Sequence, residues 1–192
     1  MKLIEMVVEP TLIFNHLIID TGKRKVYYNQ QEVLLTTKEY ELINQRERLF
    51  CLMSKVAVVY WSGTGNTEAM ASAVAEGAKG KGAEVSLLTA SEFSADQVGS
   101  YDAIAFGCPS MGAEQLEESE FEPMFAGCEG DLRGKNIALF GSYGWGDGEW
   151  MRSWEERCGD DGANLVCDSV ICNEAPDDDA LAACRELGAA LA

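Results

Sequence analysis

From residue 53 onward, short apolar segments alternate with segments of helical periodicity. Five apolar segments are predicted to be strands: Lys55–Tyr60, Glu84–Leu88, Asp102–Cys108, Asn136–Tyr143 and Asn164–Cys172. The first, third and fourth are almost continuously apolar, which is typical of strands buried on both faces of a sheet. Strands that alternate with helices predict an α/β fold, with a parallel sheet and helices on both of its faces.

The segments between these strands carry apolar residues at helical spacing. Thr67–Gly80 repeats them every four residues, and Trp150, Trp154 and Cys158 repeat the same spacing later. This periodicity predicts helices with one apolar face, so we interpret the two tryptophans as core residues. A last helix is predicted to begin near Asp177, because carboxylates stabilise the positive end of the helix dipole.

The first 52 residues do not follow this alternation. Three short strands are predicted there, at Leu12–Ile19, Lys23–Tyr28 and Glu32–Leu35, with turns at Thr21-Gly22 and Asn29-Gln30. A helix is predicted to follow, because Thr36 and Glu39 have the spacing of a capping box. The sequence therefore predicts a small, mostly β appendage over residues 1–52, followed by a domain over residues 53–192.

The two parts of the chain also differ in their charge. The net charge is −17; residues 1–52 hold seven basic and seven acidic side chains, whereas the rest holds 8 basic and 25 acidic ones. Such a surface repels nucleic acid and anionic membranes and attracts basic proteins. We expect a basic docking partner, although the carboxylates could equally serve only to keep the protein in solution.

Cysteine and histidine content excludes several kinds of site. The seven cysteines include no CxxC pair, so neither a disulfide framework nor a zinc site is indicated. The one histidine, His16, argues against histidine-based catalysis and transition-metal binding. No apolar run approaches the ~20 residues of a membrane span, and no signal-peptide pattern is present, so we expect a cytoplasmic protein.

The loop after the first predicted strand of the domain is suited to binding an anion. It consists of small and polar residues that lead directly into a helix: Ser62, Gly63, Thr64, Gly65, Asn66 and Thr67. Backbone N–H groups, hydroxyls and the helix N-terminus can together bind a phosphate. Neither a P-loop nor a GxGxxG motif is present, and the loop contains no lysine.

Two further loops follow the third and fourth predicted strands, where open α/β sheets bind their ligands. The second loop contains Ser110, Met111, Gly112, Ala113 and Glu114, and the third contains Ser142, Tyr143, Gly144, Trp145, Gly146 and Asp147. Methionine offers a polarizable surface to an aromatic ring. The tryptophan between two glycines belongs to no apolar pattern of helical or strand spacing. We therefore expect Trp145 to pack on a planar ligand.

These three loops, in this order, resemble those of the short-chain flavodoxins of anaerobic bacteria, and the resemblance covers residues 53–192. It implies a five-stranded parallel sheet in the order 2-1-3-4-5 and a bound FMN. By this resemblance, residues 62–67 bind the FMN phosphate, with Ser142 nearby. Trp145 and Met111 lie against opposite faces of the ring. Several relatives have an acidic residue where this chain has Ala113.

The resemblance also implies roles at the ring edge. The carbonyl of Gly112 would turn toward flavin N5 when one electron is taken up, and Glu114 would accept a hydrogen bond from the ring N3–H. Backbone groups of Gly144 and Gly146, with Asp147 near, would line the pyrimidine end.

The appendage has a resemblance of its own. Residues 13–43 resemble the opening of a winged-helix effector domain of response regulators, with its small sheet and first helix. Because no recognition helix or wing follows before residue 53, we expect no DNA binding. We interpret residues 1–52 either as a fused remnant or as an upstream reading frame joined to the start of the domain.

The leading hypothesis is a low-potential one-electron carrier that uses FMN, acts between redox proteins as a monomer and is not an enzyme. The alternatives are an FMN-dependent reductase on the same fold and a redox-linked DNA-binding regulator.

Overall fold

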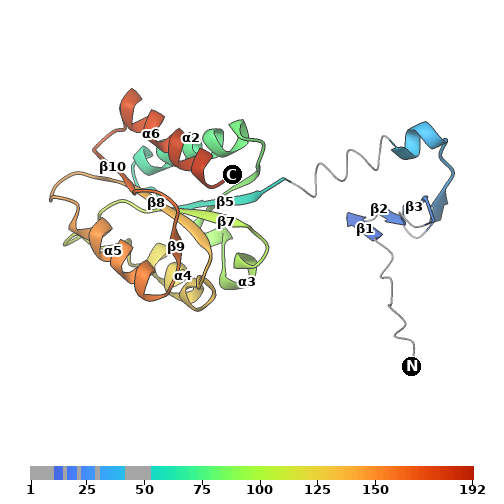
Figure 1. Cartoon of the computed structure of the whole chain (residues 1–192). Coiled ribbons are helices and arrows are strands. Elements are labelled where there is room, and N and C mark those ends of the chain that lie inside the picture. Colours follow the sequence, from blue (N-terminus) through green and yellow to red (C-terminus); the bar gives the residue numbers. More distant parts are fainter. Residues whose placement is uncertain (1–10, 15–16, 21–22, 29–30, 42–52) are drawn as a thin grey trace. The chain divides into compact units, whose positions relative to one another are not determined.

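The computed structural model describes residues 11–14, 17–20, 23–28, 31–41 and 53–192. The chain divides into two compact units, Met1–Met53 and Ser54–Ala192. Figure 1 shows the elements of both units, and each unit is described by itself.

The second unit is built on a parallel sheet. Its strands are β5 (Lys55–Tyr60), β6 (Glu84–Thr89), β7 (Ala103–Gly107), β8 (Asn136–Tyr143), β9 (Asn164–Leu165) and β10 (Val170–Asn173). They lie in the order β10-β8-β7-β5-β6, with β9 also paired to β8, and every pairing is parallel. This order agrees with the one that the resemblance implied.

One strand prediction for this unit was wrong. The predicted strand Asn164–Cys172 is two strands, β9 and β10, separated by residues 166–169, so the sheet has six strands. Asp168 lies in this break, and aspartate has a low preference for strands, which favours an interruption at this point. The main chain stays close to the sheet, because the N–H of Val166 still donates to the carbonyl of Ile137 at 3.0 Å.

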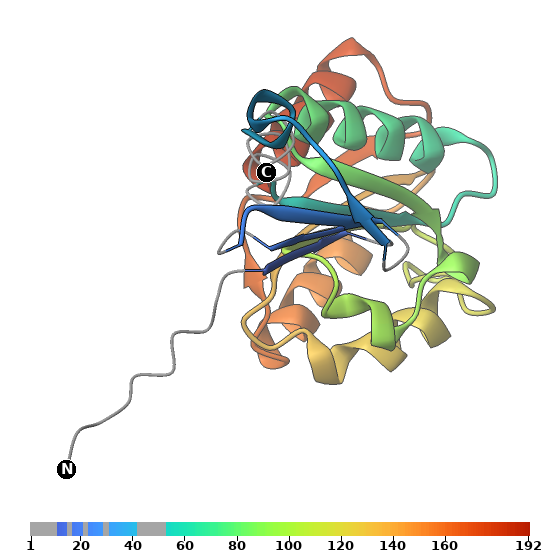
Figure 2. The ribbon, with the colours of Figure 1, turned by 90° about the vertical axis from the view of Figure 1, so that its right-hand side faces the viewer.

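Helices cover both faces of this sheet (Figures 1 and 2). They are α2 (Asn66–Gly80), α3 (Ala95–Val98), α4 (Phe121–Cys128), α5 (Glu149–Asp160) and α6 (Asp178–Ala190), with short 3₁₀ turns η1 (Ala90–Glu92) and η2 (Glu129–Asp131). Helices α2 and α6 lie together on one face, and α3, α4 and α5 lie on the other. None of the helices in the described ranges is long and apolar enough to cross a bilayer.

Glycines allow α2 and α6 to approach closely. A Cβ atom at Gly77 would lie 1.9 Å from the carbonyl oxygen of Arg185, and one at Gly188 would lie 1.9 Å from that of Val74. Only glycine at these two positions permits this distance between the helices.

The prediction of the last helix is confirmed, since α6 begins directly after Asp177, and the Asp177 side chain accepts a hydrogen bond from the N–H of Ala180. The short helices α3 and α4 were not predicted individually.

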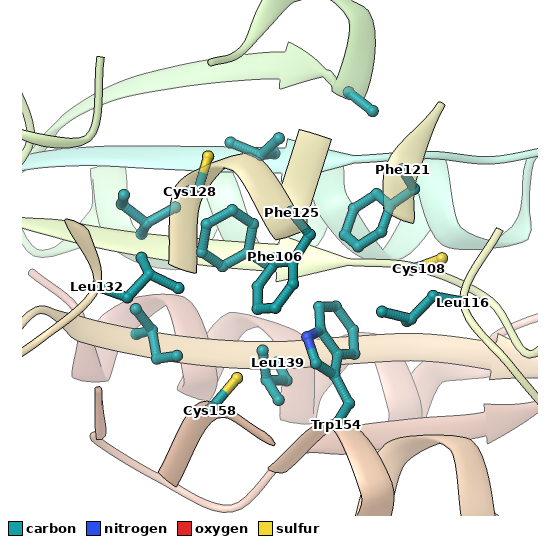
Figure 3. Close-up of a cluster of buried hydrophobic side chains, with 14 of the residues drawn as sticks. Phe106, Cys108, Leu116, Phe121, Phe125, Cys128, Leu132, Leu139, Trp154 and Cys158 are labelled. Carbon is teal, nitrogen blue, oxygen red and sulfur yellow. The ribbon is translucent and has the colours of Figure 1, made fainter. Parts of the chain in front are cut away.

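Two apolar cores fill the space between the sheet and its helices. The core under α4 and α5 is aromatic, and Trp154 meets the rings of Phe121 and Phe125 edge to face at 5.4 Å (Figure 3). Trp150 and Trp154 are both 2% exposed, which confirms their interpretation as core residues. The core under α2 and α6 is made mostly of small and aliphatic side chains.

The described residues of the first unit include a four-stranded antiparallel sheet in the order β1-β2-β3-β4. Its strands are β1 (Thr11–Phe14), β2 (Leu17–Asp20), β3 (Lys25–Tyr28) and β4 (Gln31–Val33). The predicted single strand Leu12–Ile19 is therefore wrong, since it is a pair of strands. In the sequence, Asn15 and His16 interrupt its apolar run, and asparagine is depleted in strands.

The helix predicted after these strands is present, because residues 37–41 are helical. The side chain of Glu39 accepts from the N–H of Thr36 at 2.8 Å, which completes the predicted capping box. The predicted turns Thr21-Gly22 and Asn29-Gln30 lie outside the described residues. Val26 and Tyr40 are buried in this unit.

Candidate functional site

A cleft of about 570 Å³ opens at the carboxyl ends of β5, β7, β8 and β10. From β5 the chain passes to β6 on one side and then crosses back to β7 on the other side of β5, so the winding direction reverses here and this edge is the switch point of the sheet. The cleft is lined by Trp61, Gly63, Thr64, Asn66, Pro109, Ser110, Met111, Ser142, Tyr143, Gly144, Glu174 and Ala175. No lysine or arginine in the described ranges is among these lining residues.

The first loop joins β5 to α2 and aims the helix N-terminus at the cleft edge. Gly65 is the N-cap, with a φ of +90° that an L side chain rarely adopts, and it supplies no side-chain cap. The Ser62 hydroxyl accepts from the N–H of Gly65 at 3.1 Å. Since the first N–H groups of a helix have no partner within it, this end of α2 can bind an anion.

Thr67 fastens this loop to the third one. Its hydroxyl lies 3.2 Å from that of Ser142, and both side chains are buried. Trp61 lies beneath the loop, because a Cβ atom at Gly63 would be 2.9 Å from the indole. Gly63 therefore lets the loop pass close over Trp61, which both lines the cleft and packs against the core.

The second loop is a tight turn after β7. Met111 and Gln115 exchange two backbone hydrogen bonds of 2.8 and 2.9 Å. Within this turn, Gly112 has a φ of +50° and Glu114 a φ of +53°. The left-handed conformation is uncommon for glutamate, so the turn needs other contacts to hold it.

The Glu114 side chain supplies such a contact. One carboxylate oxygen, Oε1, accepts from the N–H groups of Gly148 and Glu149 at 3.1 Å each. A Cβ atom at Gly146 would lie 2.4 Å from this carboxylate, so only glycine leaves room for it. Glu114 therefore caps α5 and joins the second loop to the third.

The third loop leaves β8 and enters α5 through two glycines of positive φ, Gly146 and Gly148. Trp145 stands on this loop with 61% of its surface exposed, and Met111 across the cleft edge is 39% exposed. Asp147 points away to the guanidinium of Arg152, at 2.7 Å. Trp145 and Met111 thus both offer apolar surface to a ligand.

The structure brings eight of the predicted site residues into the lining of the cleft: Gly63, Thr64, Asn66, Ser110, Met111, Ser142, Tyr143 and Gly144. The others belong to the same three loops without lining this cleft: Ser62, Gly65, Thr67, Gly112, Ala113, Glu114, Trp145, Gly146 and Asp147. The sequence did not point to four further lining residues, Trp61, Pro109, Glu174 and Ala175. Glu174 follows β10, so the rule that located the other loops could have found it.

A buried carboxylate holds the chain just beyond the second loop. Glu117 is 6% exposed, and it accepts from the N–H groups of Ser119 at 2.9 Å, Glu120 at 2.8 Å and Phe121 at 3.0 Å, and from the Ser119 hydroxyl. Burial raises the pKa of this carboxyl, but the hydrogen bonds outweigh burial, and the net pKa is lowered to about 2. Glu117 is therefore ionised at neutral pH, and it caps α4.

The buried thiols on this side of the sheet have raised pKa values. Cys108, at the end of β7, is buried, and burial raises its pKa well above the usual value. Burial likewise raises the pKa of Cys128 to about 11 and that of Cys158 to about 12. Since the thiolate is the nucleophile, these cysteines are inert at neutral pH.

These features define a class of protein: a doubly wound α/β domain with a cleft that can bind an anion at a helix N-terminus, and with exposed aromatic and thioether side chains at the cleft edge. The sequence model of the flavodoxin family matches residues 58–188. A flavodoxin of Megasphaera elsdenii is 47% identical over 137 residues, which are 71% of this chain and 98% of that protein. A flavodoxin of Clostridium beijerinckii is 45% identical over 135 residues, 70% of this chain and 97% of that protein.

Solved structures of flavodoxins are similar to this chain as well. The solution structure of two-electron reduced Megasphaera elsdenii flavodoxin has a TM-score of 0.66 at 48% identity, and it covers 71% of this chain and 97% of its own. A flavodoxin structure from the domain Archaea has a TM-score of 0.64 at 30% identity, and it covers 71% and 95%. The chain belongs to the flavodoxin family. It is an electron-transfer protein that binds FMN, and not an enzyme.

The residues present fit FMN. A neutral loop at a helix N-terminus suits a phosphate, and the cleft between this loop and the other two has the size of a cofactor pocket. Flavodoxin is itself a standard example of ligand binding at the switch point, so the location of the cleft follows from the fold.

Proposed function

We propose that the first loop binds the phosphate of FMN through residues 62–67. Support comes from the N-terminus of α2, the hydroxyls of Ser62 and Thr64, and the amide of Asn66, which all belong to one loop at the cleft. This donor set carries no formal charge, so a phosphate dianion leaves the cleft negative. Buried between the loops, the Thr67–Ser142 hydrogen bond keeps the phosphate loop in register with the third loop.

The flavin ring binds between the second and third loops. Trp145 stacks on one face and Met111 contacts the other; both are unusually exposed for large apolar side chains, and this supports their role. The backbone of Gly144 and Gly146 lines the pyrimidine end, with Ser110, Ala113, Tyr143 and Asp147 in the surrounding loops. The cleft, framed by three loops from three strand ends, is the observation that carries this assignment.

Gly112 and Glu114 act at the ring edge. Gly112 has no Cβ, so its peptide can turn its carbonyl toward the ring at little cost. Glu114 accepts from the ring N3–H with Oε2, since its Oε1 already serves the N-terminus of α5. Bound FMN supplies the chemistry by taking up and releasing one electron at a time.

The acidic side chains of the second unit affect both the potential of a bound flavin and the kind of partner protein. Residues 53–192 hold 25 acidic and 8 basic side chains, and this excess disfavours further negative charge on a bound flavin, which lowers its potential. The same charge attracts basic redox proteins to the exposed edge at Trp145, over distances that salt screens. The protein works in the cytoplasm as a monomer.

The first unit takes no part in this activity. A version that begins at Met53 should bind FMN with the dissociation constant of the full chain. A weaker affinity of the shorter version would contradict this proposal. A salt-sensitive gel shift of the full chain with DNA would instead support the redox-linked DNA-binding regulator.

A reductase on the same fold is the second candidate. The high pKa values of Cys108, Cys128 and Cys158 count against a thiol-based one. Anaerobic reductive titration of the FMN-loaded protein separates the two: a carrier accumulates the half-reduced state, and a two-electron reductase passes directly to full reduction.

The site assignment is tested by Trp145→Ala. Loss of a stacking surface should raise the FMN dissociation constant by about tenfold or more. The thermal stability of the flavin-free protein should stay unchanged, because the side chain is 61% exposed there. Unchanged FMN affinity would remove Trp145 from the site.

A further inference from the structure

Arg152 lies in the first turn of α5, and its side chain folds back onto the loop that precedes the helix. Nη1 donates to the carbonyl oxygen of Asp147 at 2.8 Å, and Nη2 donates to Oδ1 of the same residue at 2.7 Å. Nε and Nη2 donate to Oε2 of Glu149 at 3.2 and 2.7 Å. All three guanidinium nitrogens therefore hold the boundary between the third loop and α5.

The loop needs such a restraint. Gly146 and Gly148 flank Asp147, and both have a φ above +90°. Glycine has the largest conformational freedom of any residue, so a loop with two of them is costly to order. Gly148, the N-cap of α5, provides no side-chain cap of its own. Contacts from elsewhere must fix the path of the chain just after Trp145.

Charge alone does not explain the arrangement. The Arg152 side chain is 52% exposed, and exposed ion pairs contribute little to stability. The contact with a backbone carbonyl is different, because it fixes the main chain itself. A planar guanidinium can reach a carbonyl and two carboxylates at fixed angles, whereas an ammonium group cannot reproduce this fork.

We propose that Arg152 is a positioning residue of the flavin site, which holds the third loop in the conformation that presents Trp145 before FMN binds. The proposal rests on the proposed role of Trp145 as the stacking residue. By ordering the loop in advance, Arg152 lowers the entropy that FMN binding would otherwise have to remove. It also offsets part of the negative charge of Asp147 and Glu149 beside the site.

The first test needs no flavin. In amide hydrogen exchange of the flavin-free full chain, Arg152→Ala should speed exchange of residues 143–149, and exchange of the sheet should stay unchanged. Arg185→Ala is the matched control: Arg185 is 49% exposed and pairs with Glu76 at 3.1 Å, on helices α6 and α2. This control should leave residues 143–149 at the wild-type rate. Unchanged exchange in Arg152→Ala would overturn the proposal.

The second test measures FMN affinity. Arg152→Ala should raise the dissociation constant about two- to fivefold, and Arg152→Lys should recover only part of this loss. If Arg152→Lys binds as the wild type does, and high salt abolishes the effect of Arg152→Ala, Arg152 acts by charge alone and the positioning role is wrong.

The two tests also separate this proposal from the proposed function. Faster exchange in Arg152→Ala with unaltered FMN affinity would overturn the positioning role. Unaltered affinity in Trp145→Ala would instead count against the stacking role itself.

Discussion

Two segments that border the proposed flavin site are held in different ways. The chain from Cys108 to Glu122 is anchored by Glu117, a carboxylate that is buried and accepts four hydrogen bonds. The loop before α5 is anchored from outside, by the half-buried Glu114 and the exposed Arg152. A buried anchor has no water to replace a lost partner, whereas an exposed one does. Changes in the first segment should therefore affect the whole fold, and changes in the second should mainly affect the site.

The largest effect is expected for Glu117→Ala. The variant leaves the N–H groups at the start of α4 without an acceptor, and Phe121 is fully buried there. We expect the free energy of unfolding to fall by about 2–4 kcal/mol, measured by urea unfolding of the flavin-free protein. Glu118→Ala is the control, since this neighbour is exposed. Equal losses in both variants would remove the distinction between buried and exposed anchors.

A pH dependence of similar size follows from the same residue. The pKa of Glu117 is lowered from 4.5 to about 2 in the folded protein, so the unfolded chain binds its proton at a higher pH than the folded one. The stabilisation is complete above about pH 4.5 and is lost as the pH falls toward 2, up to roughly 3 kcal/mol. The measurement is urea unfolding of the wild type and Glu117→Gln between these pH values. Their difference should shrink as the pH falls, and a constant difference would contradict the lowered pKa.

In the exposed segment, Gly146→Ala should have a smaller effect. A φ of +91° strains any L side chain, and the new Cβ would displace the carboxylate of Glu114. We expect a loss of about 1–2 kcal/mol in stability and a clear rise in the FMN dissociation constant. Gly144→Ala is a matched control for the stability of the flavin-free protein, because its Cβ would meet no atom within 4 Å. If the two variants lose equal stability, the contact between Gly146 and Glu114 has no energetic role.

The sequence predicted the repeating strands and helices well, because strands such as Ala103–Gly107 are buried on both faces and read as continuous apolar runs. It failed where a short element broke a longer pattern. The break between β9 and β10 depends on a few polar residues within an apolar run, and α4 begins at a cap that lies within the loop before it.

The three loops around the cleft were predictable, since glycine, hydroxyl and aromatic residues recur at the strand ends. The contacts between these loops were not. Glu114 lies 34 residues from Gly148, and no local spacing indicates that its carboxylate caps α5. The hydrogen bond between Thr67 and Ser142 joins residues 75 positions apart, and no local spacing indicates it either. Contacts of this kind depend on how the sheet brings distant loops together.

The smallest effect on stability, and the sharpest test of the exposed segment, is expected at Glu114. Glu114→Ala removes the cap of α5 and should cost about 1 kcal/mol in the flavin-free protein, measured by urea unfolding. Glu114→Gln keeps one acceptor oxygen for the N–H groups of Gly148 and Glu149, so its stability should stay close to that of the wild type.

FMN affinity should respond differently in these two variants, because an amide has one acceptor oxygen and cannot serve both the helix and the ring N3–H. Glu114→Gln should therefore bind FMN about three- to tenfold more weakly although the flavin-free protein is as stable as before. Fluorescence titration of both variants with FMN gives the comparison. If Glu114→Gln binds like the wild type and Glu114→Ala does not, Glu114 acts on FMN only through the helix cap, and the ring contact assigned to it is wrong.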